Sequence, residues 1–372
     1  IGVIFMKISI DRGLLLKALN HIQSVVERRN TIPILSNVKI NANEKGISLI
    51  ATDLDLEIIE EVDANVSRAG STTVSAHILY DIVRKIPEGS SIDIEQNQDD
   101  QMELKSGQSN FDLPCLPDED FPEMSSGDMP CNFSMSSREL TRLIDKTRFA
   151  ISTEETRYYL NGIFLHSINS ELRSVATDGH RLACIKTDLP SGAEEMPSII
   201  IPRKTVGEIR KLIEDYSEDL IIKVSDTKIQ FSLKNVQLTS KLIDGTFPDY
   251  ERVIPKNNDK DLSIQTKVFS SSIDRVATIS SDKSKAVKFL LKDGALTLTV
   301  INPDAGTAVE TTPVNYEYEE LEIGFNARYL LDIASQIDGS DMLFALEGSG
   351  SPALIKDSDD MQATYVLMPM RV

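Results

Sequence analysis

The chain repeats one strand–helix unit three times along its 372 residues. Each copy runs from a β-branched strand end into a helix with an apolar stripe, and Ile82, Ile209 and Ile333 occupy matching positions. The copies lie at 74–89, 199–215 and 321–339. A period of about 125 residues is too long for a solenoid module, so the repeat indicates three similar globular domains.

A second amphipathic helix recurs with the same period, each time after a short strand of alternating apolar residues. The predicted helices cover 11–26, 136–150 and 267–280, after strands at 7–10, 132–135 and 261–265. Further alternating stretches at 47–51, 172–176 and 296–300 follow turn signals and predict antiparallel strands. The pattern predicts an α+β fold with mostly antiparallel sheet and two helices packed on it in each domain.

Two polar stretches predict the domain boundaries. The segment 117–130 is rich in Pro, Asp and Ser, and the segment 255–260 is polar. We therefore expect an N-terminal domain at 1–127, a central domain at 128–255 and a C-terminal domain at 256–372. We also expect translation to begin at Met6, with residues 1–5 as an upstream extension.

The chain is acidic, with 58 Asp and Glu against 39 Lys and Arg and a net charge of −19. Taken over the whole surface, this charge argues against binding to nucleic acid or anionic membranes. No apolar run approaches the roughly 18 residues of a membrane span. The three cysteines form no pair of zinc spacing, which favours a reducing cytoplasm and predicts no metal and no cofactor.

Candidate catalytic residues are few. Asp178 and His180 suggest a hydrolase dyad, but a tight turn uses such an Asp for backbone geometry, and no nucleophile accompanies them. Asp53, Asp55 and Glu57 alternate and are expected on one face of a strand, where such carboxylates are more often solvated than bound to metal. We predict no catalytic residues and keep a hydrolase that uses His180 and Asp178 as an alternative.

Basic residues gather on helices of successive repeats. The predicted helix at 136–150 carries four basic against two acidic residues, and the segment 202–211 carries four against one. Arg157 precedes two tyrosines, a combination suited to sugar, base or phosphate contact. Repeats arranged around an axis bring equivalent faces together, so these cations can line one surface while the acidic excess covers another.

Several motifs, in order and at fitting distances, resemble the bacterial sliding clamps, the beta subunits of DNA polymerase III. They are Arg157-Tyr-Tyr-Leu-Asn-Gly162, Ala176-Thr-Asp-Gly-His-Arg-Leu182, Pro202-Arg-Lys204, 240–250, Ile323-Gly-Phe-Asn326 and 365–371. The resemblance covers the chain from Met6 to Val372. His77, Glu154, Glu251 and Pro352 depart from residues common in the family.

The resemblance implies a non-catalytic processivity factor built as a head-to-tail homodimer, a ring of six similar clamp domains. Such a ring encircles duplex DNA without reading its sequence, so its acidic exterior and cationic lining are compatible. Dimer contacts are implied at Phe111, Leu113 and Ile279. DNA contacts are implied at Arg29, Arg84, Arg142, Tyr158, Tyr159, Arg203 and Lys204.

The resemblance also implies a peptide-binding pocket between the second and third domains. Its partners are the catalytic subunit of DNA polymerase III, the clamp loader, and other polymerases and repair proteins that carry short clamp-binding motifs. We expect action in the cytoplasm at the nucleoid and no membrane partner; an interaction scaffold that never meets DNA stays open as an alternative. The implied pocket residues are Leu160, Thr177, Gly179, His180, Arg181, Leu182, Pro248, Arg252, Val253, Asn326, Tyr329, Val366, Leu367, Met368, Pro369, Met370 and Arg371.

Overall fold

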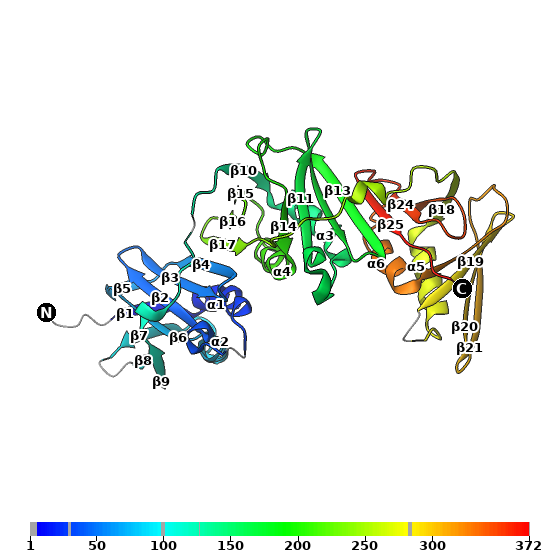
Figure 1. Ribbon diagram of the computed structural model, residues 1–372. Helices are drawn as coiled ribbons and strands as arrows, with labels where there is room; N and C mark the ends of the chain where they lie inside the picture. Colours follow the sequence, from blue (N-terminus) through cyan, green and yellow to red (C-terminus); the bar gives the residue numbers. More distant parts are fainter. Residues whose placement is uncertain (1–5, 29–30, 98–100, 126, 282–284, 372) are drawn as a thin grey trace. The chain divides into compact units, whose positions relative to one another are not determined.

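A computed structural model describes residues 6–28, 31–97, 101–125, 127–281 and 285–371 (Figure 1). The chain divides into two compact units. The first unit comprises Ile1–Thr141, Pro190–Pro197 and Lys204–Leu242, and the second comprises Arg142–Leu189, Ser198–Arg203 and Ile243–Val372. The domain boundaries expected near residues 127 and 255 stay predictions.

The first unit is built on one antiparallel sheet of 13 strands, ordered β10-β15-β16-β17-β4-β3-β2-β6-β9-β8-β7-β1-β5. Helices α1 and α2 pack against each other within it (Figure 1, blue). Its strands are β1 (Lys7–Asp11), β2 (Asn37–Asn43), β3 (Gly46–Thr52), β4 (Leu56–Val62), β5 (Asn65–Arg68), β6 (Gly70–Ser75), β7 (Ser91–Gln96), β8 (Gln101–Ser106), β9 (Ser109–Leu116), β10 (Cys131–Ser136), β15 (Asp219–Val224), β16 (Lys228–Ser232) and β17 (Val236–Lys241). Its helices are α1 (Arg12–Val25) and α2 (Ala76–Lys85), with α4 (Arg203–Leu212) from Lys204 onward and the short 3-10 helices η1 (Pro33–Ser36) and η2 (Asp118–Asp120).

The second unit holds an eight-stranded sheet, β14-β11-β12-β13-β25-β24-β23-β18, and a four-stranded sheet, β21-β20-β19-β22. Helices α5 and α6 pack against each other. Its strands are β11 (Gly162–Ile168), β12 (Glu171–Thr177), β13 (Arg181–Asp188), β14 (Ile199–Pro202), β18 (Lys260–Gln265), β19 (Ala286–Lys292), β20 (Ala295–Asn302), β21 (Gly306–Pro313), β22 (Leu321–Asn326), β23 (Asp341–Leu346), β24 (Ala353–Asp357) and β25 (Ala363–Leu367). Its helices are α5 (Thr266–Ala277) and α6 (Ala327–Ala334), with the 3-10 helices η3 (Arg148–Ala150), η4 (Glu155–Leu160) and η5 (Tyr250–Arg252); α3 (Ser137–Asp145) crosses the boundary between the units.

The predicted strand–helix repeat is confirmed. Strands β1, β10 and β18 lead directly into α1, α3 and α5, and β6, β14 and β22 lead directly into α2, α4 and α6. Local caps start several of these helices, because Asp11, Ser75 and Asn326 accept backbone N–H groups of the first turn. The turn expected at Asn169 and Ser170 is also present, with φ of +52° and +59°.

Two predictions about local structure are wrong. The helix expected to reach residue 150 ends at Asp145, because Thr147 leaves helical geometry with φ −125° and donates its hydroxyl back to the Leu143 carbonyl at 2.7 Å. Asp53, Asp55 and Glu57 do not share a strand face. Asp53 and Asp55 lie in the β3–β4 turn, where the carboxylate of Asp53 accepts the backbone N–H of Asp55 at 3.0 Å.

Candidate functional site

The turn between β12 and β13 is held by side-chain hydrogen bonds. Thr177 donates its hydroxyl to the Arg181 carbonyl at 2.7 Å, and Asp178 Oδ1 accepts the backbone N–H groups of His180 and Arg181 at 2.9 and 3.0 Å. Gly179 adopts φ +87°, and a Cβ there would lie 2.5 Å from Arg157 Nη1. Asp178 therefore shapes the turn and does not orient His180 as a base, so the geometry does not support the hydrolase dyad.

The side chain of Arg181 is fixed from several directions. Its guanidinium forms an ion pair with Asp178 at 3.1 Å and donates to the Phe149 carbonyl at 2.6 Å. It also pairs with Asp332 and lies 4.2 Å from the centre of the Tyr329 ring. These contacts fix the side chain of Arg181 beside the turn.

A cavity of about 290 Å³ lies beside Arg181, entirely within the second unit. Its apolar side chains come from η4, β13, the 248–253 segment and the end of β25, and Met368 is exposed at its edge. Nine of the expected pocket residues line it: Leu160, Thr177, Gly179, Arg181, Leu182, Pro248, Val253, Val366 and Met368.

The other expected pocket residues lie outside the lining. The ring of Tyr329 contacts the Arg181 guanidinium, and Asn326 caps α6. Leu367 follows Val366 in β25, and successive strand residues point to opposite faces, so Leu367 is buried on the face away from the cavity. His180, Arg252, Pro369, Met370 and Arg371 also do not line the cavity. The lining adds Arg157, Tyr159, Asp249 and Tyr250, all of which belong to sequence motifs already singled out.

The implied DNA contacts fall into two groups. Arg203 and Tyr158 are exposed, and among the described residues Arg203 forms no ion pair. Arg84 is also exposed but pairs with Asp81 at 3.0 Å.

The second group consists of Arg142 and Lys204, whose side chains have acidic partners. Arg142 donates to both carboxylate oxygens of Asp360 at 2.8 Å. Lys204 donates to Asp53 at 2.5 Å and to the Val25 carbonyl at 3.1 Å. Tyr159 packs edge-on against Tyr158 and lines the cavity, and Arg29 lies outside the described residues.

The implied dimer contacts lie on both units. Phe111 and Leu113 belong to β9, half-buried and buried respectively, and half-buried Ile279 follows α5. β21 is an edge strand of the four-stranded sheet, and Val309 on it and Ile301 on its neighbour β20 are 62% and 71% exposed. Long exposed edges with apolar side chains are open to pairing with another chain.

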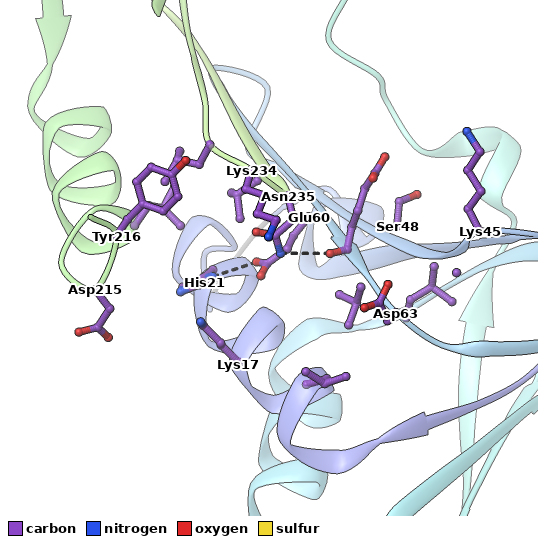
Figure 2. A pocket seen from close by; sticks show the side chains of 18 of the residues that line it. Lys17, His21, Lys45, Ser48, Glu60, Asp63, Asp215, Tyr216, Lys234 and Asn235 are labelled. Atoms are coloured by element: carbon purple, nitrogen blue, oxygen red, sulfur yellow. Dashed lines mark hydrogen bonds and ion pairs between the residues drawn. The ribbon is translucent and has the colours of Figure 1, made fainter. Parts of the chain in front are cut away.

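A larger cavity of about 550 Å³ lies within the first unit (Figure 2). Glu60 is buried there and accepts a 2.9 Å contact from His21 of α1. Four lysines and four acidic residues line this cavity, so its charges cancel. Among the described residues, no group of three or more His, Cys, Asp or Glu side chains is placed to hold a metal ion.

Comparison with known proteins then decides the family. Models of the N-terminal, central and C-terminal domains of the DNA polymerase III beta subunit match residues 6–125, 134–249 and 251–371. The chain belongs to the DNA polymerase III beta subunit family. It is therefore a sliding clamp, a non-catalytic processivity factor that acts on DNA and binds the polymerase, and the hydrolase and scaffold alternatives are wrong.

Individual relatives cover 99% or more of the chain. The beta sliding clamp of Caulobacter vibrioides (strain NA1000 / CB15N) is 51% identical over 99% of this chain and 100% of its own length, and that of Escherichia coli (strain K12) is 36% identical over the same shares. A Bartonella birtlesii sliding clamp bound to griselimycin matches with a TM-score of 0.97 and 51% identity, covering 99% of this chain and 100% of its own. A Caulobacter crescentus clamp with PEG bound to a region described as a beta-motif tethering region matches with a TM-score of 0.98 and 50% identity over both full chains.

The α+β fold expected from the repeat, and the clamp fold that the family resemblance implied, are confirmed by these matches. None of the helices in the described part of the chain is long and apolar enough to cross a membrane.

Proposed function

We propose that the 290 Å³ cavity of the second unit is the site through which this clamp holds the polymerase, the clamp loader and repair proteins. The observation that carries the proposal is a group of apolar side chains beside the fixed guanidinium of Arg181. Together with Arg181, the cavity is lined by Leu160, Leu182, Val253, Val366 and Met368. Apolar, adaptable side chains of this kind accept the Leu and Phe anchors of a short partner motif. Griselimycin, found bound to the Bartonella birtlesii clamp, is the expected competitor for the same cavity.

We propose further that the clamp encircles duplex DNA as a head-to-tail homodimer, in the cytoplasm at the nucleoid. The exposed apolar strip on β20 and β21, together with Phe111, Leu113 and Ile279, supports pairing of β21 with the β9 region of a second copy. Phosphate contact then falls first to Arg203 and Tyr158, which are exposed, and to Arg84. Arg142 and Lys204 reach phosphate only by exchanging their acidic partners, and Arg29 and Tyr159 complete the set.

The two-site proposal is tested by charge reversal at one site and a polar change at the other. Arg203→Glu with Lys204→Glu is expected to impair retention on DNA and leave griselimycin affinity unchanged, because neither residue lines the cavity. Met368→Lys is expected to weaken griselimycin binding about tenfold and leave direct binding to linear duplex unchanged, because it places a charge at the apolar edge. Loss of both properties in either variant would overturn the separation of the sites.

A further inference from the structure

One lining residue of the cavity is tied to a polar network behind it. Tyr250 is 5% exposed, yet its ring lines the cavity. Its hydroxyl lies 3.0 Å from His166 Nε2 and 3.3 Å from Arg173 Nη1. A buried tyrosine hydroxyl needs such partners, and here they fix the ring from the side away from the cavity.

Arg173, on β12, is the centre of this network. Its guanidinium donates to Glu251 at 2.6 Å and to Glu171 at 3.0 Å as well as to Tyr250. Lys186 holds the other oxygen of Glu171 at 2.6 Å. Charge-assisted hydrogen bonds in a rigid guanidinium fork fix geometry more strongly than neutral ones do. Arg173 is 16% exposed and does not line the cavity, so any effect on a ligand passes through other residues.

The segment that Arg173 holds supplies four of the thirteen lining residues: Pro248, Asp249, Tyr250 and Val253. Glu251 lies in the same short helix, η5, directly after Tyr250. On the inner side Phe164 stacks on Phe247 at 4.7 Å with the rings 4° from parallel, and also on His166 at 4.6 Å. Packing thus anchors the start of the segment, and the network anchors its middle.

We infer that Arg173 is a positioning residue for the peptide pocket, which it shapes through Tyr250 and Glu251 without touching the bound partner. This inference rests on the proposed pocket. It assigns a role to Glu251, one of the positions at which the sequence departs from common family residues, because its carboxylate completes the hold on η5. It also makes His166 part of the same support, because its Nε2 lies 3.0 Å from the Tyr250 hydroxyl and its ring stacks on Phe164.

The test is a double-mutant cycle on the full-length protein, with griselimycin as the probe in titration calorimetry. Arg173→Gln and Tyr250→Phe are each expected to weaken binding about fivefold to tenfold, because each frees the segment from one side. The double variant is expected to lose less affinity than the two single losses combined, since both changes break the hydrogen bond between Arg173 and the Tyr250 hydroxyl. Glu251→Gln removes a half-exposed carboxylate with little risk to folding and is expected to weaken binding by a smaller factor in the same direction.

Two comparisons separate positioning from stability. Arg173→Lys keeps one charged donor and is expected to recover part of the affinity. Lys288→Gln breaks a strand ion pair with Glu322 that lines no part of the cavity, and it is expected to leave affinity unchanged. A role confined to stability would lower the unfolding midpoint of Arg173→Gln and leave the affinity of the folded protein unchanged.

The outcomes distinguish the two claims. Unchanged affinity in Arg173→Gln and Glu251→Gln, or additive losses in the double variant, would overturn the positioning role while the pocket stands. Absence of griselimycin binding to the unmodified protein would overturn the proposed pocket and the positioning role with it.

Discussion

Two turns, one in each unit, are held by the same pattern of hydrogen bonds but are surrounded by different side chains, charged around the first and apolar around the second. In the β3–β4 turn Thr52 donates to the Leu56 carbonyl at 2.9 Å, as Thr177 does to Arg181 in the β12–β13 turn. Asp53 Oδ1 accepts the N–H groups of Asp55 and Leu56, as Asp178 Oδ1 accepts those of His180 and Arg181. Leu54 and Gly179 both have positive φ, +78° and +87°. These positions are 125 residues apart, the period of the repeat.

The residues around the two turns differ, and those of the second turn line the 290 Å³ cavity. At the position of Leu182, which lines the cavity, the first turn has Glu57, a buried carboxylate that accepts the Met124 backbone N–H at 2.9 Å. At the position of Met368, it has Lys241, which pairs with Asp55 at 3.0 Å. The two copies thus share one backbone arrangement, with charged side chains at these positions in the first copy and apolar side chains lining the cavity in the second.

Leu182→Glu gives the second turn the side chain of the first and is expected to have the largest effect. It buries a carboxylate among apolar residues, so we expect a loss of more than about 3 kcal/mol in unfolding free energy and no griselimycin binding. Urea unfolding and calorimetry measure both. Leu182→Met conserves volume and should cost less than about 1.5 kcal/mol; an unaltered unfolding midpoint in Leu182→Glu would contradict the comparison.

Gly179→Leu transfers another residue of the first turn. A Cβ at this position would lie 2.5 Å from Arg157, which lines the cavity, so griselimycin affinity should fall about tenfold. The reverse change, Leu54→Gly, relieves a left-handed conformation at an exposed site and should alter stability by no more than about 1 kcal/mol. Equal affinity in Gly179→Leu would show that Arg157 is free to move aside.

Asp53→Asn tests the cation held by the first turn. The asparagine keeps the Oδ1 acceptor of the turn but removes the charge that holds Lys204. Binding to short linear duplex, followed by fluorescence anisotropy at low salt, should strengthen about twofold to fivefold because the part-buried Asp53 carboxylate no longer competes with phosphate for Lys204. Combining it with Lys204→Gln should abolish the gain; a gain that persists would mean that Lys204 does not contact the duplex.

The smallest expected effect is an opposite pH dependence in the two regions. Burial lowers the pKa of His166 below 6.5, so the unfolded chain binds more protons there and this region loses stability as the pH falls below about 6.5. Burial raises the pKa of Glu57 above 4.5, so its folded state binds the extra proton and the penalty of its charge is relieved as the pH falls toward about 4.5. Unfolding midpoints between pH 7 and pH 4.5 should therefore fall less in His166→Gln and more in Glu57→Gln than in the unmodified chain; identical profiles would contradict the assignment.

Local signals explain how much of this fold could be predicted. The helix starts at Arg12, Ala76 and Ala327 follow caps that lie within three residues in sequence. The premature end of α3 could not be predicted in the same way, because Thr147 also contacts Ser174 on a distant strand at 3.1 Å. Helix periodicity in the local sequence does not reveal such a contact.

The same distinction applies to the candidate site. The motif at 176–182 led to the turn and to four of the thirteen residues that line the cavity, because its residues act within one loop. The ion pairs of Arg142 with Asp360 and of Lys204 with Asp53 join residues 218 and 151 positions apart, so no local pattern reveals that these cations already have partners. The family resemblance implied that Tyr159 contacts DNA, and no local pattern showed that its side chain also lines the cavity.

Retention by encirclement of DNA, as proposed above, reconciles a net charge of −19 with a function on nucleic acid. The most direct measurement is retention after loading by a clamp loader onto circular and onto linear duplex of the same sequence. The protein should remain on the circle through a wash at high salt and leave the linear molecule from its ends. Equal loss from both, or retention on the linear molecule, would show that the protein does not encircle DNA.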